Sequence, residues 1–386
     1  MGDTTVSSSS STKAKSERAL KVVVVEPKGD GGLCHYSYNL CRALADYGCE
    51  VHLITGAPYE LAQFPKNFKV HEYNLRSVSG LRASWKCLKA LRPDIVHQQG
   101  TNLHPLFEWV YMWASRLYSG AAYVYTCHLA IPHEIKAREM PFVGYKLRSA
   151  EAIIVHSDRT ADEAKQHFNV RADHLHVIPH GDYRFFRGLG DLGKGVPFTK
   201  VEGTKDILFF GAVRQYKGLM FLIEAIGKMR QKGLPVRLMV VGKERDDWPE
   251  YVAAMEKWGV KDSTLLNLAY IDMEDVPGFF EFADCSCLPY LDGSESGVLQ
   301  LADAFDKPIV ATETGGNAEA FEEGLIQGLV PPKDSDALAK ELERVLFEES
   351  FDEFLAKKAA RGSGKRAWPG IAIKTVDLYN LIRKQR

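Results

Sequence analysis

Two segments of this chain combine residue types that bind anionic ligands. The first is the glycine-rich turn 28–32, in which Gly31 and Gly32 follow an apolar run and precede apolar residues at helical spacing. Such glycines let backbone N–H groups approach an anion at a helix N-terminus, where the helix dipole favours negative charge. The second segment carries Arg214 and Lys217 just after the apolar run 206–210. A guanidinium fork and an ammonium point charge together suit a diphosphate.

Both segments also have plainer interpretations. Gly31 and Gly32 are compatible with a tight turn alone. Arg214 and Lys217 are compatible with solvated cations at a helix start, although the helix dipole disfavours cations there unless an anion is bound. A nicotinamide-dinucleotide fingerprint is disfavoured, because Cys34 stands where the G-x-G-x-x-G spacing needs its third glycine.

The elements around these segments predict an α/β fold. The chain has 386 residues, which corresponds to two or three domains at roughly 150 residues each. Short β-branched runs alternate with segments of helical period, as is typical of βαβ units with parallel sheets. We predict a first set of strands at 21–25, 51–54, 94–97, 123–126, 153–156 and 176–178, and a second set at 206–210, 237–241, 265–270, 285–288, 308–311 and 328–330.

Segment 188–203 is rich in glycine and lacks apolar periodicity, so it is predicted to link two Rossmann-like domains. The first domain is expected at 19–187 and the second at 204–366. Residues 1–18 contain a serine run and too few apolar residues to pack, which predicts a disordered tail. In parallel sheets, ligands bind beyond the carboxyl ends of the strands, where the turn 28–32 and Lys217 both fall.

Composition excludes some classes of partner and compartment. The net charge of -1 lacks the basic excess that nucleic acid requires, so nucleic acid is not an expected partner. Seven cysteines without a C-x-x-C pair suit a reducing compartment. No apolar run approaches the roughly 18 to 20 residues that span a bilayer. We therefore expect a cytoplasmic protein.

Motifs along the chain resemble those of one enzyme family. Segment 209–218 is similar to the second-domain signature of retaining GT-B glycosyltransferases of family 4, also called group 1. Further similarities follow in chain order at Gly31-Gly32, 93–97, 126–128, 177–181, 294–298, 307–312 and 315–319. The resemblance covers nearly the whole chain after residue 20. It implies two Rossmann-like domains with parallel sheets facing each other across a cleft, and a final helix at 367–386 that returns to the first domain.

The resemblance also implies roles for individual residues. Gly31 and Gly32 would approach the donor β-phosphate, His128 would lie beside the transferred sugar, and Arg214 and Lys217 would hold the diphosphate. The remaining expected donor contacts are Gly242, Tyr270, Ile271, Ser296, Gly297 and Val298. Without the resemblance, His128 reads as an ordinary interior histidine after a strand.

The chain departs from the family at one pair of carboxylates. The family usually has a Glu, seven residues and a second Glu, but the matching positions here are Ser294 and Ala302. Glu295 and Asp303 each lie one residue later and keep the spacing. We therefore assign Glu295 to the catalytic site and Asp303 to donor binding, while a solvated helix surface remains an alternative for Asp303. A catalytically silent GT-B binding protein and a nucleotide-sugar epimerase are the alternative functions.

The reaction implied by the resemblance is sugar transfer with retention, from a nucleotide-diphosphate sugar to an acceptor hydroxyl. In that scheme the departing β-phosphate takes the acceptor proton, and no metal or other cofactor is required. The segment Asp334-Ser335-Asp336 resembles a metal-binding D-x-D motif. A helical run follows it directly, however, which favours helix capping.

The acceptor is expected to be a carbohydrate or a lipid-linked molecule. Segment 76–92 carries five cations and no acidic residue, with Leu81, Trp85 and Leu88 at helical spacing, and segment 141–148 adds Phe142, Tyr145, Lys146 and Arg148. One interpretation is peripheral contact with an anionic membrane through these two segments. The other is an ordinary amphipathic helix whose cations face water.

Overall fold

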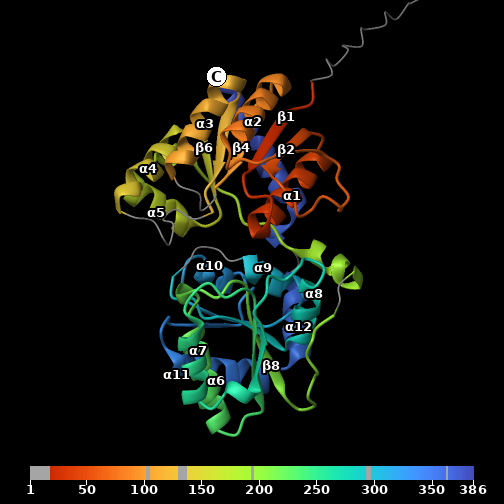
Figure 1. Ribbon diagram of the computed structural model, residues 1–386, viewed down its shortest axis with the longest axis vertical. Coiled ribbons are helices and arrows are strands. Elements are labelled where there is room, and N and C mark those ends of the chain that lie inside the picture. Colours follow the sequence, from red (N-terminus) through yellow and green to blue (C-terminus); the bar gives the residue numbers. More distant parts are fainter. Residues whose placement is uncertain (1–17, 101–104, 129–136, 193–194, 293–296, 362–363) are drawn as a thin grey trace, which may run out of the picture.

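The computed structural model describes residues 18–100, 105–128, 137–192, 195–292, 297–361 and 364–386. They form two α/β domains stacked along the long axis of the molecule (Figure 1). Each domain contains one parallel sheet, of seven strands in the first domain and six in the second, which confirms the predicted fold class.

The first sheet has the strand order β3-β2-β1-β4-β5-β6-β7. Its interior strand β1 is buried on both faces, since Val22 and Val24 pack on one side and Val23 and Val25 on the other. This explains the continuous valine run. The strands are β1 (Lys21–Glu26), β2 (Glu50–Gly56), β3 (Lys69–Tyr73), β4 (Ile95–Gln99), β5 (Ala122–Thr126), β6 (Ala152–Val155) and β7 (Leu175–Val177).

Helices cover both faces of this sheet. One face carries α1 (Gly31–Asp46) and the final helix α13 (Trp368–Lys384), and the other carries α2 (Val78–Leu91), α3 (Pro105–Ser119), α4 (Met140–Ser149) and α5 (Asp158–Phe168). The hydroxyl of Tyr379 lies 2.6 Å from His97 Nδ1, which joins α13 to β4. The last helix therefore belongs structurally to the first domain.

Strand β3 has no counterpart among the predicted strands. It pairs only with β2 at the sheet edge, and none of its five residues is fully buried. An edge strand with one solvated side can carry Lys69, His71 and Glu72, so it lacks the apolar run that identified the other strands.

The second sheet has the order β10-β9-β8-β11-β12-β13. Its strands are β8 (Lys205–Phe210), β9 (Val236–Val241), β10 (Thr264–Asn267), β11 (Cys285–Leu288), β12 (Ile309–Thr312) and β13 (Gly328–Val330), and its helices are α6 (Leu219–Gln231), α7 (Trp248–Lys257), α8 (Val276–Phe282), α9 (Gly297–Ala304), α10 (Asn317–Glu322), α11 (Ser335–Glu343) and α12 (Phe351–Arg361). Strand β10 ends three residues before the predicted limit, so Tyr270 lies in the loop at the rim of the cleft.

Two chain segments cross between the domains side by side. The amide of Asp182 donates to Arg366 O at 3.0 Å, and Trp368 Nε1 donates to Asp182 O at 2.8 Å. The 3-10 helix η3 (Arg184–Leu192) follows the first crossing and buries Phe186 and Leu189. These side chains join a core cluster that also contains residues of α8 and α9, so the start of the predicted linker packs against the second domain.

Candidate active site

A cavity of about 640 Å³ lies where the carboxyl edges of the two sheets face each other. Such a volume falls in the range of small-molecule sites. Among the described lining residues, the cations are Lys28, Lys146, Lys217, Lys243 and Arg245, whereas Asp30 is the single carboxylate. The excess of cations suits a ligand with several negative charges.

The glycine-rich turn lies at the first-domain side of the cavity, where two carboxylates hold it. Glu26 Oε1 accepts from the Lys28 amide at 2.9 Å and its Oε2 from the Gly29 amide at 2.7 Å. Glu60 Oε2 accepts from the Gly31 amide at 2.8 Å. Gly31 and Gly32 both line the cavity as expected. The Gly31 N–H is already engaged, however, so the free first-turn amide nearest to it belongs to Gly32.

Lys217 reaches the cavity from the second domain. Its side chain is buried, and burial lowers the pKa of its ammonium to about 8. A Cβ on Gly211, which has a φ of +96°, would lie 2.7 Å from Lys217 Nζ, and a Cβ on Gly242 would lie 2.3 Å from Gly211 O. Glycine is therefore required at both positions to leave room for this lysine and for the close approach of the two loops.

Arg214 is not among the residues that line the cavity. Its Nη1 lies 4.0 Å from Asp246 Oδ1 on the neighbouring loop. The cations that accompany Lys217 are instead Lys243 and Arg245, which follow β9 and Gly242. Sequence reasoning missed these two, although they stand just past a strand end, the same signal that identified Lys217.

His128 follows β5, lines the cavity and lies in a cluster of aromatic side chains. Its ring contacts those of Tyr36, His156 and His180. Its Nδ1 lies 3.1 Å from His156 Nε2, and its Nε2 lies 3.0 Å from Gln99 Oε1. Burial, together with the neighbouring histidines, lowers the pKa of His128 well below its ordinary value.

The expected donor contacts at the second domain fall into two groups. Gly242, Tyr270, Ile271, Gly297 and Val298 line the cavity. Glu295 and Ser296 lie outside the described residues.

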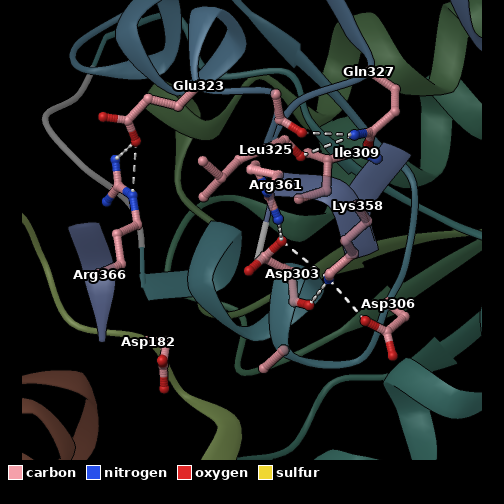
Figure 2. Close-up of polar contacts among 12 residues, drawn as sticks. Asp182, Asp303, Asp306, Ile309, Glu323, Leu325, Gln327, Lys358, Arg361 and Arg366 are labelled. Carbon is pink, nitrogen blue, oxygen red and sulfur yellow. Dashed lines mark hydrogen bonds and ion pairs between the residues drawn. The ribbon is translucent and has the colours of Figure 1, made fainter. Parts of the chain in front are cut away.

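Asp303 is not among the residues that line the cavity, and its carboxylate faces Lys358 and Arg361 (Figure 2). Its Oδ1 lies 3.0 Å from Lys358 Nζ and 2.6 Å from Arg361 Nη2, both on α12. Asp303 lies five positions after Val298, which at about 100° per residue turns the two side chains about 140° apart on α9. The structure thus places Asp303 in a buried ion-pair cluster between α9 and α12 and not at the donor site.

The Asp334-Ser335-Asp336 segment caps a helix. Asp334 Oδ1 accepts from the amides of Asp336 and Ala337 at 3.1 and 2.9 Å, at the start of α11. No group of three or more His, Cys, Asp or Glu side chains in the described part of the chain is arranged to hold a metal ion.

Two Rossmann-like domains with a cationic cavity at their facing carboxyl edges define a GT-B architecture. Residues 30–181 match the family model for Glycosyltransferase Family 4, and residues 204–348 match the model for Glycosyl transferases group 1. Together the two matches span most of the chain. The chain belongs to the group 1 glycosyltransferases of family 4.

Individual relatives are distant. An uncharacterized glycosyltransferase of Methanocaldococcus jannaschii is 24% identical over 92% of this chain and 95% of its own length. A D-inositol 3-phosphate glycosyltransferase of Nocardiopsis dassonvillei is 24% identical over 60% of this chain and 56% of its own length.

Solved structures show the same fold. Sucrose-phosphate synthase of Thermosynechococcus elongatus superposes with a TM-score of 0.73 at 16% identity, over 95% of this chain and all of that one. HepE of Anabaena, solved in complex with UDP, superposes with a TM-score of 0.71 at 16% identity, over 94% of this chain and all of that one. In this chain, no helix within the described ranges has the length and apolar character needed to cross a membrane.

Proposed function

We propose that this chain transfers a sugar, with retention of configuration, from a nucleotide-diphosphate sugar to a hydroxyl group of its acceptor. The observation that carries the proposal is the position of Lys217, Lys243 and Arg245 on one wall of the cavity, opposite the glycine-rich turn and His128. Cations and N–H groups converge there from both domains, where a diphosphate would lie. UDP complexes of a structural neighbour support a nucleotide donor.

In the proposed reaction the bond between the sugar and the β-phosphate breaks, and negative charge grows on the phosphate. Lys217 and the first-turn amides of α1 stabilise this charge, because they are fixed before the reaction begins. The acceptor oxygen attacks on the face that the phosphate leaves, and the phosphate oxygen accepts the acceptor's proton. This pathway needs no protein nucleophile.

Metal independence is part of the proposal, because side chains and amides supply the positive charge that a divalent cation would otherwise provide. Transfer should therefore persist in excess EDTA. Loss of transfer in EDTA and its recovery with Mg²⁺ or Mn²⁺ would contradict this part.

One observation favours the catalytically silent alternative. Ala302 is buried and Asp303 is engaged by Lys358 and Arg361, so neither supplies a carboxylate to the cavity. An experiment distinguishes the retaining transferase from the silent binding protein. The chain is incubated with a panel of UDP-, GDP-, ADP- and TDP-sugars, and the anomeric proton of any product is examined by NMR. An axial product from an axial donor supports the proposal. Binding of a donor without transfer or hydrolysis would favour the silent protein.

We propose that the acceptor is membrane-borne. The residues that support this proposal in the structure differ in part from those in segments 76–92 and 141–148 that the sequence indicated. The cations Arg76, Arg82, Lys86, Lys89 and Arg92 are exposed, and none has an ion-pair partner among the described residues. Lys146 of the second basic segment is buried instead, 2.6 Å from Glu108, and lines the cavity. It cannot face a lipid surface.

Helix α3, next to α2 in Figure 1, adds an apolar stripe that the sequence reasoning did not identify. The stripe consists of Leu106, Val110, Trp113 and Leu117, which are 37%, 45%, 61% and 69% exposed. These positions follow the i, i+4, i+7, i+11 spacing of one helix face. Trp85 of α2 stacks on Tyr118 of α3 at 5.9 Å between ring centroids, so the cations lie beside the stripe. An anionic lipid surface fits both features.

Vesicle sedimentation tests this contact. The wild type should sediment with vesicles that contain phosphatidylglycerol, less with pure phosphatidylcholine, and less at high salt. Replacing Trp113 and Leu117 by Ser should abolish sedimentation. The matched control replaces Ile373 and Leu381, exposed apolar residues of α13, by Ser, and should sediment like the wild type. Equal recovery of all proteins in the supernatant would favour a soluble acceptor.

A further inference from the structure

Glu60 holds the glycine-rich turn at two points. It lies in the loop after β2, and its side chain is 17% exposed. Its backbone N–H donates to Gly29 O at 2.9 Å, and its Oε2 accepts from the Gly31 N–H at 2.8 Å. Glu26 holds the Lys28 and Gly29 amides at the start of the turn, and Glu60 fixes its second half, between Gly29 and Gly31.

The same carboxylate reaches across the cleft. Its Oε1 accepts from the hydroxyl of Tyr270 at 2.7 Å, and Tyr270 belongs to the second domain and lines the cavity. His35 Nε2 lies 3.1 Å from Oε2. Burial alone would raise the pKa of Glu60. The hydrogen bonds from His35, Tyr270 and the Gly31 amide outweigh the effect of burial, so the pKa lies below its ordinary value. Glu60 is thus a carboxylate, which accepts hydrogen bonds through both oxygens.

These contacts join two parts of the proposed donor site that come from different domains. Gly32, the last residue of the turn, and Leu33, which follows it, line the cavity, and their N–H groups belong to the first turn of α1. Where they lie depends on the turn, and the turn is held by Glu60. The hydrogen bond to Tyr270 exists only while the two rims of the cleft are together.

We infer that Glu60 is a positioning residue that ties the glycine-rich turn to Tyr270, so that closing the cleft and presenting the turn's amides to a donor diphosphate are one event. The ligand in this inference, a nucleoside diphosphate group, rests on the proposed function. The cross-cleft contact can be tested without it.

The chain offers a matched control on the same rim. Gln63 Nε2 donates to Glu274 Oε1 at 3.0 Å, between the same two loops, and no hydrogen bond in the described part of the chain joins Gln63 to the glycine-rich turn. Gln63→Ala removes a cross-cleft hydrogen bond and leaves the turn alone. Tyr270→Phe keeps the ring and removes only the hydroxyl, and Glu60→Gln keeps the shape and removes the charge.

The first measurement is calorimetric binding of UDP and of GDP to the wild type, Glu60→Gln, Tyr270→Phe, the double variant and Gln63→Ala. Each single variant at Glu60 or Tyr270 should weaken binding about tenfold, a common size for coupling between sites. The double variant should be no weaker than the weaker single variant, and Gln63→Ala should match the wild type. Independent, multiplicative effects at Glu60 and Tyr270, or an equal loss in Gln63→Ala, would overturn the inference.

The second measurement is small-angle X-ray scattering of the ligand-free proteins. Glu60→Gln and Tyr270→Phe should have a larger radius of gyration than the wild type. Equal radii would overturn the inference whether or not a nucleotide binds. Failure of the wild type to bind UDP or GDP, with the expected difference in radii, would count against the proposed donor and leave the cross-cleft contact supported.

Discussion

The Nε2 atom of His156 lies 3.1 Å from the Nδ1 atom of His128, in the middle of a chain of hydrogen bonds. One end of the chain is Ile178 O, 2.9 Å from His156 Nδ1, and the other is Gln99 Oε1, 3.0 Å from His128 Nε2. Both ends are acceptors, so the two rings need three protons to make all three bonds. Two neutral imidazoles carry only two.

The chain of hydrogen bonds therefore links the charge on the His128 and His156 rings to the orientation of the Gln99 amide. A neutral pair of rings requires the Gln99 amide to turn its NH₂ group toward His128, and this nitrogen has no other partner in the described structure. A protonated pair keeps the carbonyl there. Burial favours the neutral pair, and a bound diphosphate would favour the charged one.

Gln99→Glu should raise the pKa of His128 by about one unit or more, because a carboxylate beside Nε2 stabilises the imidazolium. His180, His97 and the Arg366 guanidinium face the two rings and oppose the positive charge in both proteins. Side-chain ¹⁵N NMR of His128 against pH measures the shift. Gln99→Leu serves as the control without a charge, and a pKa of His128 in Gln99→Glu no higher than in the wild type would contradict the proton count.

The affinity for a nucleoside diphosphate should fall as the pH rises above about 8. Burial lowers the pKa of Lys217 to about 8, so above that pH the ammonium that would meet the phosphates is lost. Calorimetric titration of UDP and GDP between pH 6.5 and 9.5 measures the dependence. The affinity of Lys217→Arg should not fall near pH 8, since a guanidinium stays charged. If the affinity of Lys217→Arg also fell near pH 8, a group other than Lys217 would cause the fall.

Lys217→Ala should lower turnover at least about a hundredfold with the fold intact, which corresponds to roughly 3 kcal/mol of transition-state stabilisation. Lys228→Ala, an exchange of a lysine outside the cavity, is the control. Turnover close to that of the wild type in Lys217→Ala would remove the basis for its role.

The free energy of unfolding should decrease as the pH falls from about 6.5 toward 4. Burial lowers the pKa of His97 to about 3 and that of His156 to about 4. In this window the unfolded chain binds protons that the folded chain does not, so each histidine contributes a slope of up to about 1.4 kcal/mol per pH unit. Urea denaturation at several pH values measures the slope. His97→Gln should reduce it, and an unchanged slope would show that His97 titrates normally.

Asp303→Asn should destabilise the fold and leave catalysis unchanged. Breaking a buried ion pair costs about 3 kcal/mol, because Lys358 and Arg361 keep their charges without a partner. Thermal unfolding measures the loss, and initial rates well below the melting temperature measure catalysis. A rise in the KM for the donor at unchanged stability would return Asp303 to the donor site.

The sequence by itself determined the fold class and part of the site. Apolar runs such as 22–25 must be buried on both faces of a sheet, which requires βαβ connections and hence ligand sites at the carboxyl ends of the strands. It was therefore predictable that residues directly after these strands, among them Gly242 and His128, lie at this edge, whereas their roles in the site were expected only from the resemblance to the family. Their positions follow from the chain direction alone.

Only the tertiary structure decided which way neighbouring side chains point and which loops meet. Arg214 and Arg245 both follow strand ends, but the packing of two loops turns Arg214 toward Asp246 and leaves Arg245 at the cavity. Asp303 keeps the expected spacing and still faces α12. Glu60 carries no sequence signal, because its role arises from Tyr270, 210 positions away along the chain. Contacts over such separations depend on how the domains pack, and a local pattern does not contain that information.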